Sequence, residues 1–364
     1  MTIMNYQDIT ILCLWNPWKG GYQCFDFFNQ EILTALDKMN VHYLVARTPE
    51  EAIRLYKENK IDFSFCIGQY CFFHNGEALY DIFCVVNYEW VIDNPFKYSE
   101  NTASPYHRLV MIDDEFHLMP GFAREDYMTL SLGIPEVQYQ GTQKRIQAVL
   151  VPWKIKKISV LENNIEQSEM CSQLFDFINH YDYDSSYIRA LTAYFSKHEV
   201  ADQISFFMLS NDYIRLKKRL DMLNAIREYP IVIATDEKIE GLSGSNISYV
   251  PKGNFMTTLT LQQRYRYVLN NNPNYDVCLH DRVGHAISNG AVVVSDRNRL
   301  MQELNFPMTL PHSDFSKLDE MLFSSDNSAP EIAAVQNSCT KDYRMKRTME
   351  KMIQHYLLWA DKTY

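Results

Sequence analysis

The sequence lacks the features that mark redox, nucleic-acid-binding and membrane proteins. None of its 8 cysteines belongs to a Cys-x-x-Cys pair, and their scatter predicts reduced, mostly buried thiols and a cytoplasmic location. Asp and Glu (45) outnumber Lys and Arg (35), so the formal net charge is −10. We therefore expect neither nucleic acid nor a membrane surface as a partner, because both bind through clustered cations.

Long hydrophobic runs are absent as well. The longest apolar runs, residues 9–15 and 291–294, have the length of strands, whereas a membrane helix needs about 20 apolar residues. Residues 1–10 are polar and lack a charged segment followed by an apolar one. We therefore expect no transmembrane segment and no secretory signal.

Several catalytic and metal-binding motifs are missing. There is no Gly-x-Ser-x-Gly elbow and no His-Glu-x-x-His, and His280 and His285 are spaced too far apart to share one helix face. Gly20-Gly21 follows the first expected strand without the third glycine of a Gly-x-Gly-x-x-Gly motif. These absences disfavour a serine hydrolase, a metal site and a dinucleotide-dependent dehydrogenase.

The pattern that is present predicts two α/β domains in the 364 residues. In the first half, strands are expected at 9–15, 41–45, 61–67, 82–87 and 109–112, with helices at 23–39 and after Thr48, whose cap is completed by Glu51. The alternation of strands and helices predicts a parallel sheet covered on both faces. We place this domain at residues 1–152.

The second domain is expected at residues 153–340. It opens with a helical segment, 165–227, and continues with strands at 231–234, 247–250, 268–270 and 291–295 and helices at 261–267 and 282–288. A last amphipathic helix, within 341–364, ends the chain. Clefts between two such domains commonly hold small-molecule sites.

Residues 270–296 are the most informative segment. Polar residues 270–273 lead to a short helix that begins near Asp281 and ends at Asn289-Gly290, a C-cap signature, before a buried strand. Arg282 and His285 lie near the start of this helix. A helix N-terminus and an arginine fork both favour an anion such as a diphosphate.

This segment resembles the donor-binding segment of GT-B glycosyltransferases. It is closest to the CgeB-like (spore maturation) group, whose pattern is Glu-Arg-Val-Phe-Glu-Ala-x-Ala-x-Gly-Ala, followed by an apolar strand and Ser/Thr-Asp. The matching residues run from Asp281 through Val283 to Ala291, and Asn270 and Asn272 resemble the group's Leu-Asn-x-Asn strand end. Gly20-Gly21 resembles the glycine loop of such enzymes, and residues 90–96, with Asp93, resemble the group's aspartate–proline segment.

The resemblance implies a GT-B fold with two facing Rossmann-like domains and a last helix that crosses back to the first. It implies a nucleoside-diphosphate-sugar donor, such as a UDP- or GDP-sugar, and no required metal or other cofactor. By position Arg282 contacts the diphosphate, and His285 replaces a glutamate that usually binds the ribose. The donor site we predict comprises Gly20, Gly21, Arg219, Asn270, Asn272, His280, Asp281, Arg282, Val283 and His285.

Alternatives remain open for these residues. Arg282 can instead pair with Asp281 or Asp276, His285 can be a structural histidine, and Arg219 can lie on a solvated helix face. A general base is expected in the first domain, with Asp93 ahead of Asp26 and His117, although transferases of this fold that retain configuration can lack one.

The leading functional hypothesis is transfer of a sugar to a glycan, a lipid-linked glycan or a protein. The alternative is a catalytically degenerate GT-B scaffold that serves as a partner subunit in glycan assembly, which the His285 replacement motivates. The sequence leaves the sugar, the acceptor and the oligomeric state undetermined.

Overall fold

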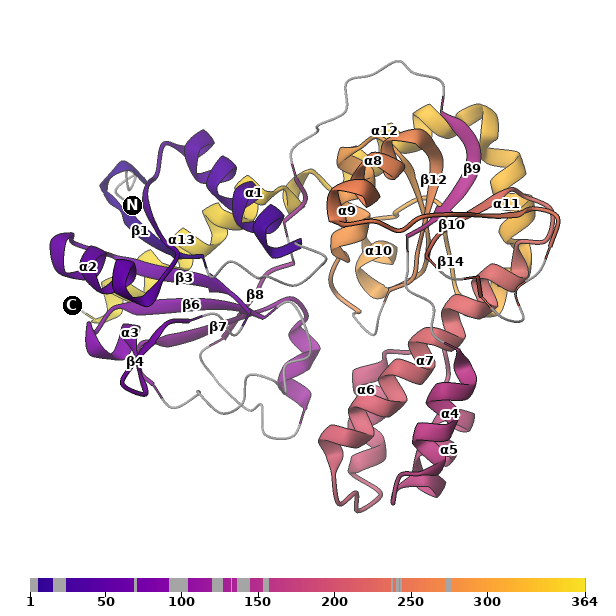
Figure 1. Cartoon of the computed structure of the whole chain (residues 1–364), viewed down its shortest axis with the longest axis horizontal. Helices are drawn as coiled ribbons and strands as arrows, with labels where there is room; N and C mark the ends of the chain where they lie inside the picture. The colour runs from indigo at the N-terminus through magenta and orange to yellow at the C-terminus, as the bar shows by residue number, and fades with distance from the viewer. Residues whose placement is uncertain are drawn as a thin grey trace. The chain divides into compact units, whose positions relative to one another are not determined.

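The computed structural model describes most of the chain as two compact units (Figure 1). The described residues are 6–15, 24–68, 71–91, 104–119, 127–131, 133–135, 145–152, 157–236, 238–239, 242, 244–272 and 276–363. The first unit comprises Met1–His117, Gly121–Gly133 and Asp342–Tyr364, and the second comprises Leu118–Pro120 and Ile134–Lys341. Both units are α/β, as the alternating pattern predicts.

The first unit is built on a parallel sheet of six strands in the order β2-β1-β3-β6-β7-β8. These strands are β1 (Thr10–Leu14), β2 (His42–Ala46), β3 (Phe63–Ile67), β6 (Val86–Val91), β7 (His107–Met111) and β8 (Tyr127–Thr129). A small hairpin, β4 (Phe73–His74) and β5 (Glu77–Ala78), precedes the short helix α3 (Leu79–Ile82). The strand order reverses between β1 and β3, and ligands of such sheets bind outside the carboxyl ends of the strands at this point.

Helices cover both faces of this sheet. On one face Phe63 and Tyr88 contact α13 (Met345–Thr363), which also packs with α1 (Cys24–Met39). On the other face lie α2 (Pro49–Glu58) and α3, whose Tyr56 and Tyr80 belong to the same buried cluster as Leu12 and Cys66. Successive strand residues point to opposite faces, so each strand supplies both cores.

The second unit contains a second parallel sheet, in the order β11-β10-β9-β12-β13-β14. Its strands are β9 (Ile146–Val151), β10 (Ile231–Ala234), β11 (Ile247–Val250), β12 (Tyr265–Asn270), β13 (Val292–Asp296) and β14 (Thr309–Leu310). In chain order this is 3-2-1-4-5-6, the order of dinucleotide-binding Rossmann sheets, with the reversal between β9 and β12.

Helices flank the second sheet on both sides (Figure 1). Helices α7 (Gln203–Ala225) and α11 (Leu318–Ser325) share one buried cluster with β9, β10, β12 and β13. Helices α8 (Phe255–Arg264) and α9 (Asp281–Ser288) pack together on the other side. Helix α12 (Ala329–Cys339) contacts α9 and β13, and its Ala329 belongs to the first cluster. Helices α4 (Ile158–Glu166), α5 (Cys171–His180) and α6 (Tyr187–Phe195) pack with the first half of α7, and α10 (Arg299–Glu303) follows β13.

The structure corrects three expectations. Strand β9 pairs with β10 and β12, so residues 146–151 belong to the second unit, although we expected the first domain to extend to residue 152. Ile82 ends the helix α3 rather than starting a strand. Residues 265–267 open strand β12 instead of continuing a helix, because pairing with β9 overrides their local pattern.

The predicted caps are confirmed. Thr48 caps α2 and accepts the backbone N–H of Glu51 at 3.2 Å, while the Glu51 carboxylate accepts the backbone N–H of Arg47 at 2.8 Å. Asn289 ends α9, and Gly290 follows at φ +72°, the left-handed conformation that a helix C-terminus favours in glycine.

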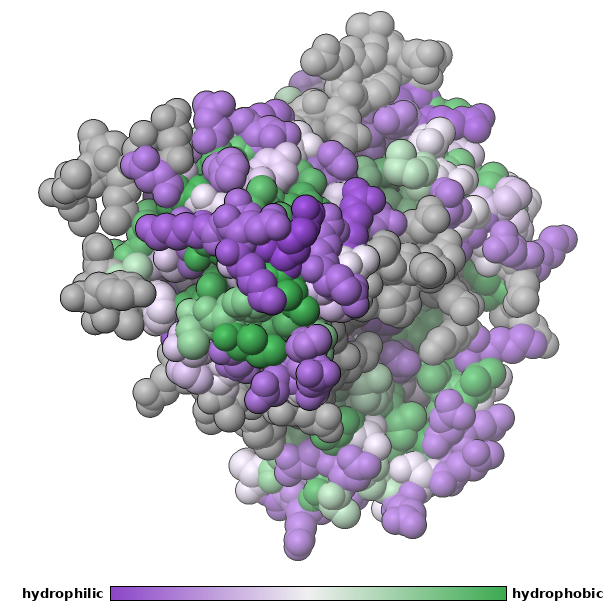
Figure 2. Space-filling model, turned by 60° about the vertical axis from the view of Figure 1, so that its left-hand side comes forward, coloured by the Kyte–Doolittle hydropathy of each residue, from purple (hydrophilic) through white to green (hydrophobic). Residues whose placement is uncertain are grey.

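The composition predicted reduced cysteines and no transmembrane segment, and the structure bears on both. All eight cysteines are free, with Cys13, Cys66, Cys71 and Cys278 buried and Cys84 exposed. No helix in the described ranges is long and apolar enough to cross a membrane. On the face in Figure 2, hydrophilic residues cover much of the described surface, and apolar residues show between them in several places.

A buried glutamine extends the hydrogen bonding of β13. The Gln336 side chain of α12 accepts the backbone N–H of Val293 at 2.9 Å, and its amide donates to the carbonyls of Val293 at 2.8 Å and Pro307 at 3.0 Å. The short strand β14 pairs only with Ser295 and Asp296, so this amide bonds the backbone of β13 beyond that pairing.

We expect Gln336→Leu to lower the free energy of unfolding by about 1–3 kcal/mol, because buried backbone groups of β13 lose their partner. Urea denaturation followed by far-UV circular dichroism measures this loss. Val335→Leu, at an exposed position of the same helix, is the control and should leave the unfolding midpoint unchanged. Equal midpoints for the two variants would contradict the role given to Gln336.

Candidate functional site

Polar side chains gather at the carboxyl edge of the second sheet. Strand β12 ends in Asn270 and is followed by Asn271 and Asn272, while β13 ends in Ser295 and Asp296. All five residues are buried. Because this edge lies beside the reversal of strand order, it is the expected ligand-binding edge of such a sheet.

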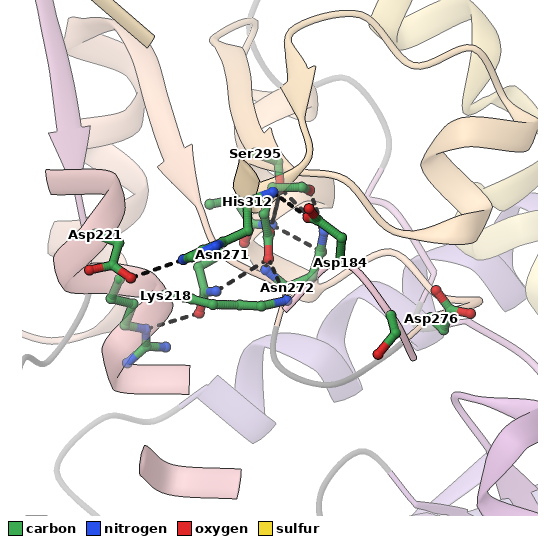
Figure 3. Close-up of polar contacts among 12 residues, drawn as sticks. Asp184, Lys218, Asp221, Asn271, Asn272, Asp276, Ser295 and His312 are labelled. Carbon is green, nitrogen blue, oxygen red and sulfur yellow. Dashed lines mark hydrogen bonds and ion pairs between the residues drawn. The ribbon is translucent and has the colours of Figure 1, made fainter. Parts of the chain in front are cut away.

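Hydrogen bonds fix these five side chains to one another, and Figure 3 labels Asn271, Asn272 and Ser295 among them. The Asn270 amide donates to Ser295 Oγ at 2.9 Å, and the Asn272 amide donates to the Asp296 carbonyl at 2.8 Å. The Asp296 carboxylate accepts the backbone N–H of Asn272 at 2.6 Å. The edge is therefore a rigid platform.

Two arginines reach this platform from helices on opposite sides of the sheet. Arg282 of α9 donates from Nη1 to Asn270 Oδ1 at 3.0 Å, and Arg219 of α7 donates from Nε to Asn271 Oδ1 at 3.3 Å. Consecutive residues of a strand point to opposite faces, which explains why Asn270 meets α9 and Asn271 meets α7. Of the predicted residues, the structure thus brings Arg219, Arg282, Asn270 and Asn272 together.

The electrostatics of Arg219 indicate a cationic site. Its side chain is 8% exposed. Burial, with the positive charges of Arg215 and Arg282, lowers the pKa of Arg219 well below its ordinary value, and Asp212 and Asp296 offset only part of this. Cations held together in this way are stabilised when an anion binds between them.

The start of α9 carries its own charges. His280 is the N-cap residue, with Nδ1 accepting the backbone N–H of Arg282 at 3.2 Å and contacting the Asp281 carboxylate. Burial lowers the pKa of His280, against the influence of Asp281. Burial by itself raises the pKa of Asp281, but His280, His285 and Arg282 outweigh it and hold that pKa well below its ordinary value. Asp281 is therefore ionised, and anion binding here depends on the arginines more than on the helix end.

His285 and Val283 lie inside the unit. Val283 is fully buried, and His285 is 2% exposed with its ring edge-to-face against Phe255 at 5.1 Å. Burial lowers the pKa of His285 to about 4, with His280 and Arg282 acting in the same direction and Asp281 opposing them. The imidazole is therefore neutral at pH 7.

Gly284 stands where the resembled pattern has phenylalanine. A Cβ placed on Gly284 meets Ile134 Cγ1 at 3.1 Å and Ile134 Cα at 3.4 Å. The close approach of Ile134 to α9 therefore leaves no room for an aromatic side chain. This departure from the pattern has a packing reason.

The predicted residues of the first unit are placed only in part. Asp26 accepts the indole N–H of Trp15 at 2.8 Å, and the Arg47 guanidinium lies 4.6 Å from the center of the Trp15 ring. His117 is exposed, contacts the Asp114 carbonyl and stacks on Tyr127 at 6.0 Å. Gly20, Gly21 and Asp93 lie outside the described residues.

Sequence reasoning missed Asn271, Ser295 and Asp296 of the platform as site residues. It also missed Lys218, whose Nζ lies 3.7 Å from the Asp296 carboxylate and whose side chain is only 11% exposed. The signal was present, since Asn271 lies between two predicted asparagines and Lys218 precedes Arg219. Asp276, one of the alternative partners named for Arg282, accepts the backbone N–H of Arg299 at 3.0 Å. Within the described ranges, no group of three or more acidic, His or Cys residues has metal-binding geometry.

Comparisons with known proteins identify the fold. No family model matches the chain, and no curated protein sequence matches it at a significant level. Among solved structures, AviGT4, a glycosyltransferase involved in avilamycin A biosynthesis, has a TM-score of 0.54 at 11% identity, covering 96% of this chain and 97% of that chain. Sucrose-phosphate synthase from Thermosynechococcus elongatus has a TM-score of 0.52 at 8% identity, covering 97% and 100%.

A third match was solved with ligands. It is an α-glucosyltransferase in complex with UDP and a 13-mer DNA, with a TM-score of 0.57 at 9% identity, covering 96% of this chain and 99% of that chain. This fold thus occurs in a protein that binds DNA, so our exclusion of nucleic acid rests on net charge alone. At these identities the likeness concerns the fold. The chain has the α/β fold of GT-B glycosyltransferases, with two parallel sheets of six strands and flanking helices.

Proposed function

We propose that this chain is a glycosyltransferase that takes a sugar from a nucleoside-diphosphate-sugar bound at the carboxyl edge of its second sheet. The observation that carries the proposal is the approach of Arg219 and Arg282 to Asn271 and Asn270 at this edge. The GT-B fold supports it, as does the UDP held by an α-glucosyltransferase of the same fold. The closer likeness to the CgeB-like group rests on residues 270–296.

The diphosphate is the part of the donor that this edge suits best. Arginine presents planar N–H donors that match phosphate oxygens. Asn270 and Asn271 hold the two guanidinium groups in place, which reduces the entropy lost on binding. Two fixed arginines also stabilise the negative charge that develops on the diphosphate as its bond to the sugar breaks.

The remaining roles in the mechanism follow from the same proposal. We place the general base, if the reaction uses one, at Asp93. Asp26 is the weaker candidate because its carboxylate already accepts the Trp15 indole N–H. We propose a glycan, a lipid-linked glycan or a protein as acceptor, since the net charge of −10 disfavours DNA. We also propose a cytoplasmic location, which the scattered cysteines favour. No step of this mechanism needs a metal.

Calorimetric titration with UDP, GDP, CDP and dTDP tests the donor site. We expect one nucleotide to bind saturably, and Arg282→Ala to weaken it by about 1.5–3 kcal/mol, as for a hydrogen bond to a charged group. The control is Arg54→Ala, which removes an exposed arginine of α2 and should leave the affinity unchanged. Binding that Arg282→Ala does not weaken would remove Arg282 from the site.

The degenerate scaffold remains the second candidate, favoured by one observation. His285 occupies the position of the usual ribose-binding glutamate but is buried, and its pKa of about 4 keeps it neutral. It therefore cannot act as a charged acceptor for two ribose hydroxyls. If the folded protein binds none of the four nucleotides at millimolar concentration, the scaffold is the better reading.

A further inference from the structure

A pocket of about 380 Å³ lies within the second unit, on the side of the platform that carries Lys218. One wall is supplied by the loop between α5 and α6, residues 181–186, and by Tyr187 at the start of α6. The residues that follow β12 and β13, including Asn272 and Asp296, supply the other. Its volume is at the lower end of the range of small-molecule sites, roughly 300–1,000 Å³, so it suits a ligand of one or two rings.

The charges around the pocket are balanced. Lys218, Arg297 and Arg299 line it together with Asp184, Asp276 and Asp296. A ligand with a net charge of either sign therefore meets three groups of its own sign as well as three opposite ones. An uncharged ligand with many hydroxyl groups suits both sets, because each hydroxyl donates one hydrogen bond and accepts others.

The carboxylates are fixed by the backbone. Asp184 accepts the backbone N–H groups of His312 and Ser313, the latter at 3.1 Å, and Asp276 accepts that of Arg299 at 3.0 Å. Figure 3 shows Asp184 and His312 close together near Asn272. These bonds hold the pocket in shape before a ligand arrives, which favours binding.

An aromatic wall completes the pocket. The Tyr183 ring stacks on His312 at 4.7 Å, and His312 Nε2 is bonded to Asp221 at 2.9 Å, so the ring is held in place. The center of the Tyr181 ring lies 5.3 Å from the center of the Tyr183 ring. Amide side chains of Asn272, Asn298 and Gln302 also line the pocket. Flat apolar rings beside amides and carboxylates match the C–H faces and hydroxyl edges of a sugar.

We propose that this pocket binds a neutral sugar residue, packed against Tyr183 and hydrogen-bonded by the amides and fixed carboxylates around it. The site is separate from the arginines that we assign to the diphosphate, and the proposal does not depend on that assignment. It gives the α5–α6 loop, which is part of the helical segment ahead of α7, a role in recognising a carbohydrate.

Saturation-transfer NMR on the full chain tests this proposal. The probes are a panel of neutral mono- and disaccharides, with glucose 6-phosphate and uridine for comparison. We expect at least one neutral sugar to bind, and Gln302→Leu and Tyr183→Leu each to weaken it about tenfold, as for the loss of one contact group. Arg54→Ala, at an exposed position of α2 in the first unit, should leave sugar binding unchanged.

Three results would overturn the proposal. The first is that no neutral sugar of the panel binds. The second is that neither Gln302→Leu nor Tyr183→Leu weakens sugar binding, or that Arg54→Ala weakens it equally. The third is that glucose 6-phosphate or uridine binds in a Gln302-dependent way while the neutral sugars do not, which would make the ligand an anion or a nucleobase. Native circular dichroism of each variant establishes that it is folded.

Discussion

Replacing Glu89 by alanine will lower the free energy of unfolding of the first unit by about 1–3 kcal/mol, the usual cost of leaving a buried polar group without its hydrogen-bond partner. Glu89 on β6 is 3% exposed and His107 on β7 is fully buried, and Nε2 of His107 lies 2.7 Å from the Glu89 carboxylate. Among the described residues, the other ring nitrogen, Nδ1, is buried without a hydrogen-bond partner. Without Glu89 the described part of the chain offers this imidazole no hydrogen-bond partner, and its burial keeps solvent away.

The packing around this pair leaves little room for adjustment. Tyr80 of α3 stacks on the His107 ring at 5.3 Å and is itself 2% exposed. Ser64 and Asn87, on the same side of the sheet, are bonded to each other at 2.8 Å. The site therefore cannot collapse onto the space left by a carboxylate, nor can water enter without disturbing α3.

Urea denaturation followed by tryptophan fluorescence is the measurement. Trp15, Trp18, Trp90 and Trp359 all belong to the first unit, so fluorescence mainly reports its unfolding. The control is Glu89→Gln, which keeps the volume and one hydrogen bond and should cost less than half as much. If Glu89→Ala unfolds at the same urea concentration as the unsubstituted protein, the pair contributes nothing to the fold.

Acidification will destabilise helix α9 through His285, with a loss on the order of 2 kcal/mol between pH 7 and pH 5 and about 3 kcal/mol by pH 4. The folded-state pKa of about 4 lies below the ordinary value of 6.5. Below pH 6.5 His285 binds a proton in the unfolded chain, whereas in the folded chain it binds that proton only near pH 4. Stability from this group is therefore present above pH 6.5 and falls as the pH drops toward 4.

Hydrogen exchange of the α9 backbone, measured by mass spectrometry at several pH values, reports this opening free energy. The comparison is with His285→Gln, which removes the titrating group while it keeps a polar side chain of similar reach. The two proteins are compared by how the difference in their opening free energies changes with pH, rather than by its absolute size. This comparison separates His285 from His280, because His280 is present in both proteins and burial lowers its pKa as well. Parallel pH profiles for the two proteins would show that His285 titrates normally.

Loss of Glu89 and protonation of His285 should have different consequences for activity. Glu89 belongs to the first unit and the platform to the second, so its loss should act through stability alone. His285 is on the helix that carries Arg282. If the donor binds as proposed, acid opening of α9 should weaken nucleotide binding over the same pH range, and nucleotide should in turn protect α9 from exchange.

Local signals in the sequence determined most of the elements. The strand at 231–234, the cap at Thr48 and the end of α9 at Asn289-Gly290 were predicted and are confirmed. Each depends on residues within one turn or one strand, where periodicity, capping and the freedom of glycine act directly. The same local information identified the segment 270–296, because a polar strand end, a short helix and a buried strand follow one another there.

The tertiary structure alone decided the rest. Pairing with β10 and β12 assigns β9 to the second sheet, and no pattern within residues 146–151 states this. The contact of Arg219 with Asn271 joins residues 52 positions apart, and the Glu89–His107 pair joins two strands across the first sheet. A sequence specifies the side chains and their local hydrophobic periodicity. Which of them share a buried space depends on strand order and helix packing, and these are settled by the free energy of the whole core rather than by any one segment.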